Sequence, residues 1–122
     1  MIGMKLKLSS LKKKADKLWS ERIRSIGQCE YCNGKKNLNA HHIISRSYTN
    51  LRWDLRNGIC LDCNCHKFNR SNSFHNNPFV AVDWITRYRE RDVCYLKEMV
   101  KLPIKKLTTD DMLEIIKTLV TK

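Results

Sequence analysis

Apolar residues recur at helical spacing near the start of the chain. Between Leu11 and Ile26 they fall three or four positions apart, which is the period of one face of an α-helix. Ser10 is a residue type that caps a helix start, and Gly27 is one that ends a helix. The pattern predicts a helix from Leu11 to about Ile26, with lysines mostly on its outer face.

The middle of the chain is rich in turn residues and holds two short apolar runs. Leu38 to Ile44 and Ile59 to Leu61 are therefore predicted to form two short strands. We expect a further helix to begin between Cys65 and Phe74. Together with the helical segments on either side, these runs predict an α+β fold.

The C-terminal part predicts three helices. Asn77 followed by Pro78 is typical of a helix start, because Asn caps and Pro fits the first turn. A second helix is expected over residues 92–101, before Pro103. Thr109 is expected to cap the last helix, whose apolar stripe predicts packing rather than chemistry.

A chain of 122 residues has the length of one domain. We expect a basic N-terminal helix over residues 1–27, a turn-rich core over 28–77 and helices over 78–122. No apolar run approaches the roughly 20 residues of a membrane span, and no signal-peptide core occurs. These features favour an intracellular protein that does not bind membranes.

Charge points to a polyanionic partner. The chain has 24 Lys and Arg against 12 Asp and Glu, a net charge of +12, which favours nucleic acid. Contacts to phosphates give affinity without sequence information, and no segment resembles a base-reading module, so we expect little base specificity. The candidate phosphate contacts are Lys12, Lys13, Lys14, Arg46, Arg52 and Arg56.

Five of the six cysteines lie in two clusters, Cys29 with Cys32, and Cys60 with Cys63 and Cys65. In an intracellular protein such clusters indicate metal binding rather than disulfides. Two C-x-x-C turns can supply the four thiolates of a structural zinc site. The predicted zinc ligands are Cys29, Cys32, Cys60 and Cys63.

Cys65 leaves this ligand set open. The spacing Cys63-Asn64-Cys65 is tighter than that of a usual zinc knuckle, but Cys65 can replace Cys60 or Cys63. Asp62 lies three residues before Cys65 and is a further, weaker candidate that would bind through oxygen.

All four histidines flank the cysteine clusters. His41 and His42 are adjacent between the two clusters, whereas His66 and His75 follow the second. Neighbouring residues of a strand point to opposite faces, so His41 and His42 would have different roles. This grouping in a basic protein favours a functional site over packing.

These motifs resemble the HNH nuclease family. The segments AHHIISR, RWDLRNGIC and CLDCNCHK occur in the family's order, and FHNNPFVAVDW is similar to a His-x-x-Pro segment of phage HNH proteins. The resemblance runs from Cys29 to about Trp84. Among subfamilies it is most similar to phage recombination endonucleases of the NinG/Rap type, which combine zinc knuckles with this core.

The resemblance implies a zinc-stapled ββα-metal core (HNH, or His-Me finger) flanked by helices. It implies His42 as the general base, Asn57 as the residue that orients it, and His41 as a ligand of the catalytic cation. His66, with His75 second, would supply a further ligand. The expected cofactors are structural Zn²⁺ and catalytic Mg²⁺ or Mn²⁺.

The implied activity is hydrolysis of DNA phosphodiester bonds, in recombination or branched-DNA processing. A phage-encoded protein of this kind would act in the host cytoplasm, as a monomer or a homodimer. A rival interpretation keeps the zinc and the charge but not the catalysis, and describes a DNA-binding accessory protein. A third interpretation is a nuclease that acts on RNA.

Overall fold

The structure is a computed structural model, and it describes residues 6–68, 74 and 76–121 of the chain. It is an α+β fold with one two-stranded antiparallel sheet, which confirms the predicted class. In chain order the elements are α1 (Leu8–Arg24), β1 (Leu38–His42), a 3₁₀ turn η1 (Leu55–Asn57), β2 (Gly58–Asp62), a π-helical turn η2 (Asn64–Phe68), α2 (Pro78–Tyr88), α3 (Glu90–Met99) and α4 (Thr109–Val120).

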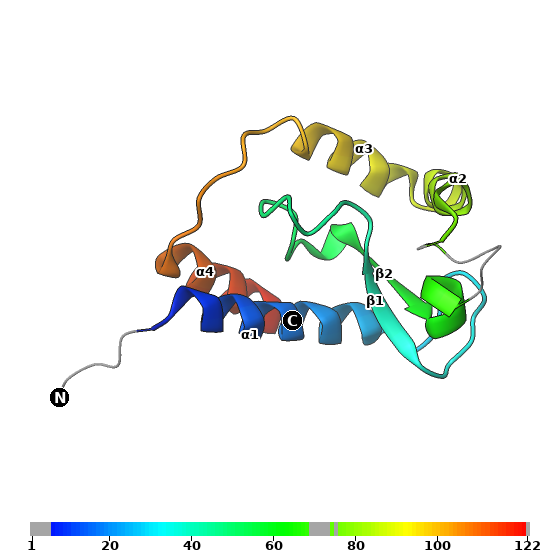
Figure 1. The fold of residues 1–122 in the computed structure, drawn as a ribbon, viewed down its shortest axis with the longest axis horizontal. Helices are drawn as coiled ribbons and strands as arrows, with labels where there is room; N and C mark the ends of the chain where they lie inside the picture. Colours follow the sequence, from blue (N-terminus) through cyan, green and yellow to red (C-terminus); the bar gives the residue numbers. More distant parts are fainter. Residues whose placement is uncertain (1–5, 69–73, 75, 122) are drawn as a thin grey trace.

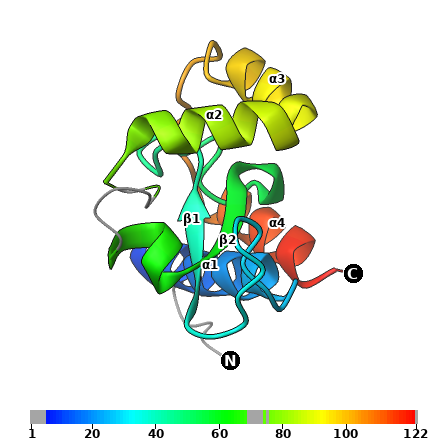
Figure 2. The ribbon, with the colours of Figure 1, turned by 90° about the vertical axis from the view of Figure 1, so that its right-hand side faces the viewer.

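The hairpin lies between two groups of helices. α1 and α4 lie side by side on one side of β1 and β2, and α2 and α3 lie on the other (Figures 1 and 2). No helix of the described residues is long and apolar enough to cross a membrane.

The first helix begins earlier than its sequence pattern predicts. Its first hydrogen bond runs from the Leu11 N–H to the Lys7 carbonyl, so the N-cap is Lys7 and Ser10 lies inside the first turn. Lys7 makes no side-chain cap. The helix ends at Arg24, and Gly27 follows in the left-handed region with a φ of 81°, as expected of a residue that closes a helix.

The later helices keep their predicted order. The Asn77 side chain accepts hydrogen bonds from the Phe79 and Val80 N–H groups, which confirms this cap. α3 begins at Glu90, two residues earlier than predicted. The last helix is capped by Thr108 rather than Thr109, because Thr108 and Asp111 form a reciprocal capping box.

The strand register decides which face of the hairpin each side chain occupies. His42 pairs with Gly58, and Ala40 pairs with Cys60, so these residues share the face that packs on α1. His41 pairs with Ile59 and faces the opposite way, towards α2. The two adjacent histidines therefore lie on opposite faces, as expected.

Each face of the hairpin has its own hydrophobic core. Trp19, Trp53 and Met112 belong to the core between α1 and α4, whereas Ile59 and Leu61 pack with the residues of the second core, under α2. A two-stranded sheet is marginal in water, so the hairpin needs both layers.

An ion-pair network attaches α3 to the hairpin. The Arg89 guanidinium donates to Asp92 at 2.6 Å, to Glu30 at 3.3 Å and to the Gly58 carbonyl at 3.0 Å. Arg56 donates to the same Asp92 carboxylate at 2.8 Å. Burial alone would raise the pKa of Asp92, but the hydrogen bonds from Arg56 and Arg89 outweigh it and lower that pKa.

Asp92→Asn should reduce the free energy of unfolding at pH 7 by about 1–2 kcal/mol, because it leaves two guanidinium groups without their shared anion. A carboxylate with a lowered native pKa stabilises the fold above its unfolded pKa and loses this effect on acidification. Urea unfolding should therefore show the difference from wild type shrinking below about pH 4. Asp83→Asn, in the exposed pair with Arg87, should change stability by less than about 0.5 kcal/mol; an equal loss in both variants would contradict the network's role.

Candidate metal centre and histidine site

Three thiols and one carboxylate meet at the end of the hairpin. The ligand atoms of Cys29, Cys32, Asp62 and Cys65 all lie within 4.8 Å of one another. Thiolates and a carboxylate in a group of four are a donor set that suits tetrahedral Zn²⁺. The residues present therefore fit a structural zinc ion.

A tight turn presents the first two thiols. The Cys29 N–H donates to the Gly34 carbonyl at 2.7 Å, and the Asn33 N–H donates to the Cys29 carbonyl at 2.9 Å. The Cys32 N–H points at the Cys29 sulfur, at 3.5 Å. Asn33 adopts a left-handed φ of 66°, which Asn tolerates better than most residues. This is the knuckle that the C-x-x-C spacing predicts.

Asp62 connects the knuckle to the second half of the cluster. One carboxylate oxygen accepts the Cys65 N–H at 2.8 Å, and the other lies 2.7 Å from the Cys32 sulfur. Asp62 and Cys65 are three residues apart, the same spacing as in C-x-x-C. This Asp-x-x-Cys spacing is the signal that identifies Asp62, which the sequence ranked as the weaker ligand.

Cys60 and Cys63, the preferred second pair of the prediction, are not among the residues of this cluster, which instead brings the alternatives Cys65 and Asp62 beside Cys29 and Cys32. Residues 58–62 are an extended strand, so they cannot form the turn that a Cys60–Cys63 knuckle requires. Cys60 is buried, its N–H donates to the Glu30 carboxylate at 2.6 Å, and burial raises its pKa to about 11.

Two thiols of the cluster, those of Cys32 and Cys65, favour the protonated form without a metal. The hydrogen bond to Asp62 and then burial raise the pKa of Cys32, and burial raises the pKa of Cys65. Burial would also raise the pKa of Asp62, but hydrogen bonds from Cys32, Cys65 and Asn64 lower it overall. Metal binding would therefore displace thiol protons while the carboxylate is already ionised.

Cys65→Ser should lower the zinc content of purified protein well below one ion per chain, since it removes one of four ligands. Cys63→Ser, two residues away, and Cys94→Ser, on the exposed face of α3, are matched controls that should keep the ion. Metal analysis by mass spectrometry with thermal unfolding would measure both effects. Loss of zinc in Cys63→Ser but not in Cys65→Ser would contradict the revised ligand set.

His42 is held on two sides. Its ring stacks on the indole of Trp19, with centroids 3.9 Å apart and planes 7° apart. Its Nε2 lies 2.8 Å from the Arg52 carbonyl oxygen, which can only accept, so Nε2 carries the proton and Nδ1 carries the lone pair. Burial lowers the pKa of His42, which favours the neutral ring at pH 7. The side chain is only partly buried.

Asn57 closes the loop that follows β1. Its side chain is fully buried, accepts the Ile44 N–H at 2.6 Å, and donates to the Ile44 and Leu51 carbonyls, both at 3.0 Å. Its backbone carbonyl accepts the Ile43 N–H at 3.0 Å. Asn57 thus fixes both ends of the loop that leads to the Arg52 carbonyl.

His41 and His66 lie together on the other face of the hairpin. Their ring centroids are 4.9 Å apart, and the His41 ring is 6.1 Å from Phe74. His41 also lines a pocket of about 270 Å³, which is walled by apolar residues of α2 and α3 such as Ile85 and Leu96. His75 lies outside the described residues.

The predicted phosphate contacts fall into two groups. Arg52 is paired with Asp16 at 2.6 Å and Arg56 with Asp92 at 2.8 Å, so both guanidinium groups already have a carboxylate partner. Arg46 is exposed in the loop after β1. Among the lysines of α1, Lys13 and Lys14 are exposed and Lys12 is partly buried.

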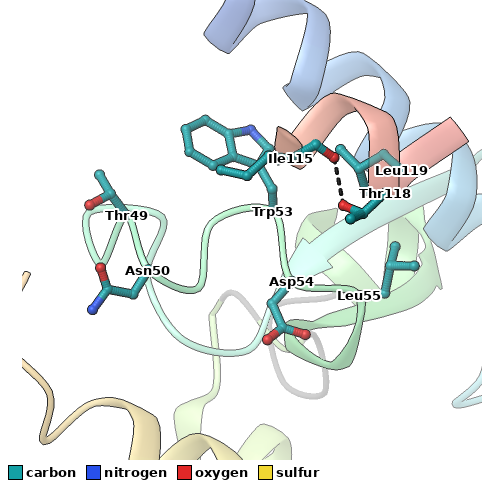
Figure 3. A pocket seen from close by; sticks show the side chains of 8 residues that line it. All are labelled: Thr49, Asn50, Trp53, Asp54, Leu55, Ile115, Thr118 and Leu119. Atoms are coloured by element: carbon teal, nitrogen blue, oxygen red, sulfur yellow. Dashed lines mark hydrogen bonds between the residues drawn. The ribbon is translucent and has the colours of Figure 1, made fainter. Parts of the chain in front are cut away.

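The pocket in Figure 3, of about 380 Å³, lies between the 49–55 loop and α4. Its carboxylate, on Asp54, accepts the Arg56 N–H at 2.9 Å and the Tyr95 hydroxyl. The Thr118 hydroxyl donates to the Ile115 carbonyl within α4, at 2.7 Å. These polar groups serve the fold, and no predicted histidine or cysteine is among the described residues that line the pocket.

Comparison with known proteins identified no family model, no curated protein and no solved structure that matches this chain.

Proposed function

We propose that the protein is a metal-dependent endonuclease of the HNH type that hydrolyses phosphodiester bonds in DNA. The observation that carries this proposal is the environment of His42, whose Nε2 is held by a backbone carbonyl and whose pKa is lowered by burial, so that the neutral imidazole is favoured at pH 7. In that tautomer Nδ1 can accept a proton from water, which is the task of a general base at neutral pH.

The loop between the strands supports this role. Asn57 holds the loop through four hydrogen bonds, counting those of its side chain and its carbonyl. The loop in turn carries the Arg52 carbonyl that orients His42. Asn57 would thus act on the base through the backbone rather than on the substrate.

We propose His41 and His66 as ligands of the catalytic cation, because the centroids of their rings lie only 4.9 Å apart. When bound, Mg²⁺ or Mn²⁺ would neutralise charge on the phosphate and on the leaving oxygen. Imidazole ligands favour Mn²⁺ over Mg²⁺, which prefers oxygen. The zinc cluster contributes structure, not chemistry.

His42→Ala should reduce plasmid cleavage in Mn²⁺ or Mg²⁺ by at least about 100-fold, the usual contribution of a positioned general base. Asp83→Asn, on the far exposed side of α2, should cleave like wild type. Zinc content and thermal unfolding would show that both variants are folded. If neither wild type nor His42→Ala cleaves DNA or RNA while wild type binds DNA, the accessory-protein interpretation replaces this one; equal cleavage by both proteins would move the base elsewhere.

We further propose that the exposed lysines of α1 bind the DNA backbone. α1 also carries Trp19, whose ring stacks on that of His42, so these lysines and a contact of the proposed catalytic residue belong to the same helix. Backbone contacts of this type supply sequence-independent affinity that weakens with salt. The net charge of +12 favours the same partner.

Lys13→Gln combined with Lys14→Gln should weaken DNA binding and lower the slope of log K against log salt by about 0.9 for each phosphate that the variant no longer neutralises. Fluorescence anisotropy with duplexes of unrelated sequence, from low to moderate salt, would measure this slope. Lys101→Gln, which removes a lysine paired with Glu98 on α3, is the control. An unchanged slope in the double variant would place the DNA on another face.

A further inference from the structure

We propose that α1 belongs to the active site, because two of its residues, Asp16 and Trp19, position the His42 imidazole. We call the four side chains that do this the His42 brace: Asp16, Trp19, Arg52 and Trp53. The inference rests on the role proposed above for His42, and it assigns positioning residues to an element outside the predicted nuclease core.

The stack on Trp19 fixes the plane of the imidazole. Trp19 is only 2% exposed, and its indole N–H donates to the Asp54 carbonyl at 2.9 Å, so the indole itself is fixed. Rings 3.9 Å apart and 7° from parallel leave the imidazole no room to tilt towards α1. A rotation of the ring by 180° about its Cβ–Cγ bond would keep the same plane. It would replace Nε2 with a ring carbon and so break the hydrogen bond to the Arg52 carbonyl.

Gly58 permits this close approach. It pairs with His42 across the hairpin, and a Cβ at this position would lie 2.3 Å from Ile23 and 2.8 Å from Trp19. A larger residue would have to displace the Ile23 side chain and the Trp19 indole, so glycine at this position is compatible with the stack of Trp19 on His42.

Asp16 fixes the carbonyl that orients the ring. Its carboxylate accepts two hydrogen bonds from the Arg52 guanidinium, at 2.9 and 2.6 Å, and a third from the Trp53 indole at 2.8 Å. Arg52 and Trp53 are consecutive, so one carboxylate holds the peptide segment whose carbonyl binds His42. Asn57 holds Leu51, the residue before Arg52, by donating a hydrogen bond to its carbonyl.

This arrangement explains an acidic side chain on a basic helix. Asp16 is surrounded in sequence by lysines, and a carboxylate there opposes DNA binding. The hydrogen bonds from Arg52 and Trp53 account for a carboxylate at this position. Arg52 accordingly acts as a positioning residue rather than a phosphate contact.

The kinetic test is Asp16→Asn, which keeps the shape and removes the charge. We expect kcat for plasmid cleavage to fall about 10-fold or more, since small displacements of a catalytic group are costly. DNA affinity should stay equal or increase. Asp16→Glu should recover part of the loss, and Asp83→Asn should match wild type. A fall in affinity with unchanged kcat would overturn the proposal.

A second readout does not depend on cleavage. Long-range ¹H–¹⁵N spectra of the zinc-loaded full chain, at about pH 8 where imidazole is neutral, report the tautomer and the ring-current shift of His42. Wild type should show the Nε2-protonated form shifted upfield by Trp19, and Asp16→Asn should show mixed tautomers and a smaller shift. Unchanged His42 signals in Asp16→Asn would overturn the proposal even if wild type proved to be inactive, whereas an inactive wild type with the predicted spectra would refute only the nuclease function.

Discussion

The attachment of the Cys29–Cys32 turn to the end of β2 is the constraint on which the rest of the structure depends. A two-stranded hairpin is only marginally stable in water, and a chain of 122 residues has a small core. Asp62 joins the two halves of the cluster, because it contacts the Cys32 sulfur and the Cys65 N–H at once. An ion held by these ligands would fix the strand end from which the register of the hairpin follows.

The strand register then decides which face of the hairpin each histidine occupies. Because neighbouring strand residues alternate, His42 lies against α1 while His41 lies beside His66, under α2. At the far end of the hairpin, Asn57 holds the loop that orients His42. The cluster and the buried amide therefore secure opposite ends of the same two strands, and β1 carries His41 and His42.

Local patterns in the sequence predicted the helices well, because periodicity and caps act over a few residues. Asn77 caps α2 as its type suggests, whereas Ser10 does not cap α1, since the helix continues back to Lys7. The sequence predicts a strand over Ile59 to Leu61 and still favours Cys60 and Cys63 as ligands, because the contact between Asp62 and Cys32, 30 residues apart, forms only in the folded chain. The Asp16–Arg52 ion pair joins residues 36 positions apart, so no local spacing in the sequence predicts it.

The most direct test of this account is X-ray absorption spectroscopy at the zinc edge of the purified full-length protein. The ligand atoms that meet at Cys29, Cys32, Asp62 and Cys65 predict a first shell of three sulfur scatterers and one oxygen. A first shell of four sulfurs would mean that Cys60 or Cys63 binds the ion in place of Asp62. Absence of bound zinc would contradict the claim that an ion at this cluster holds the end of the hairpin.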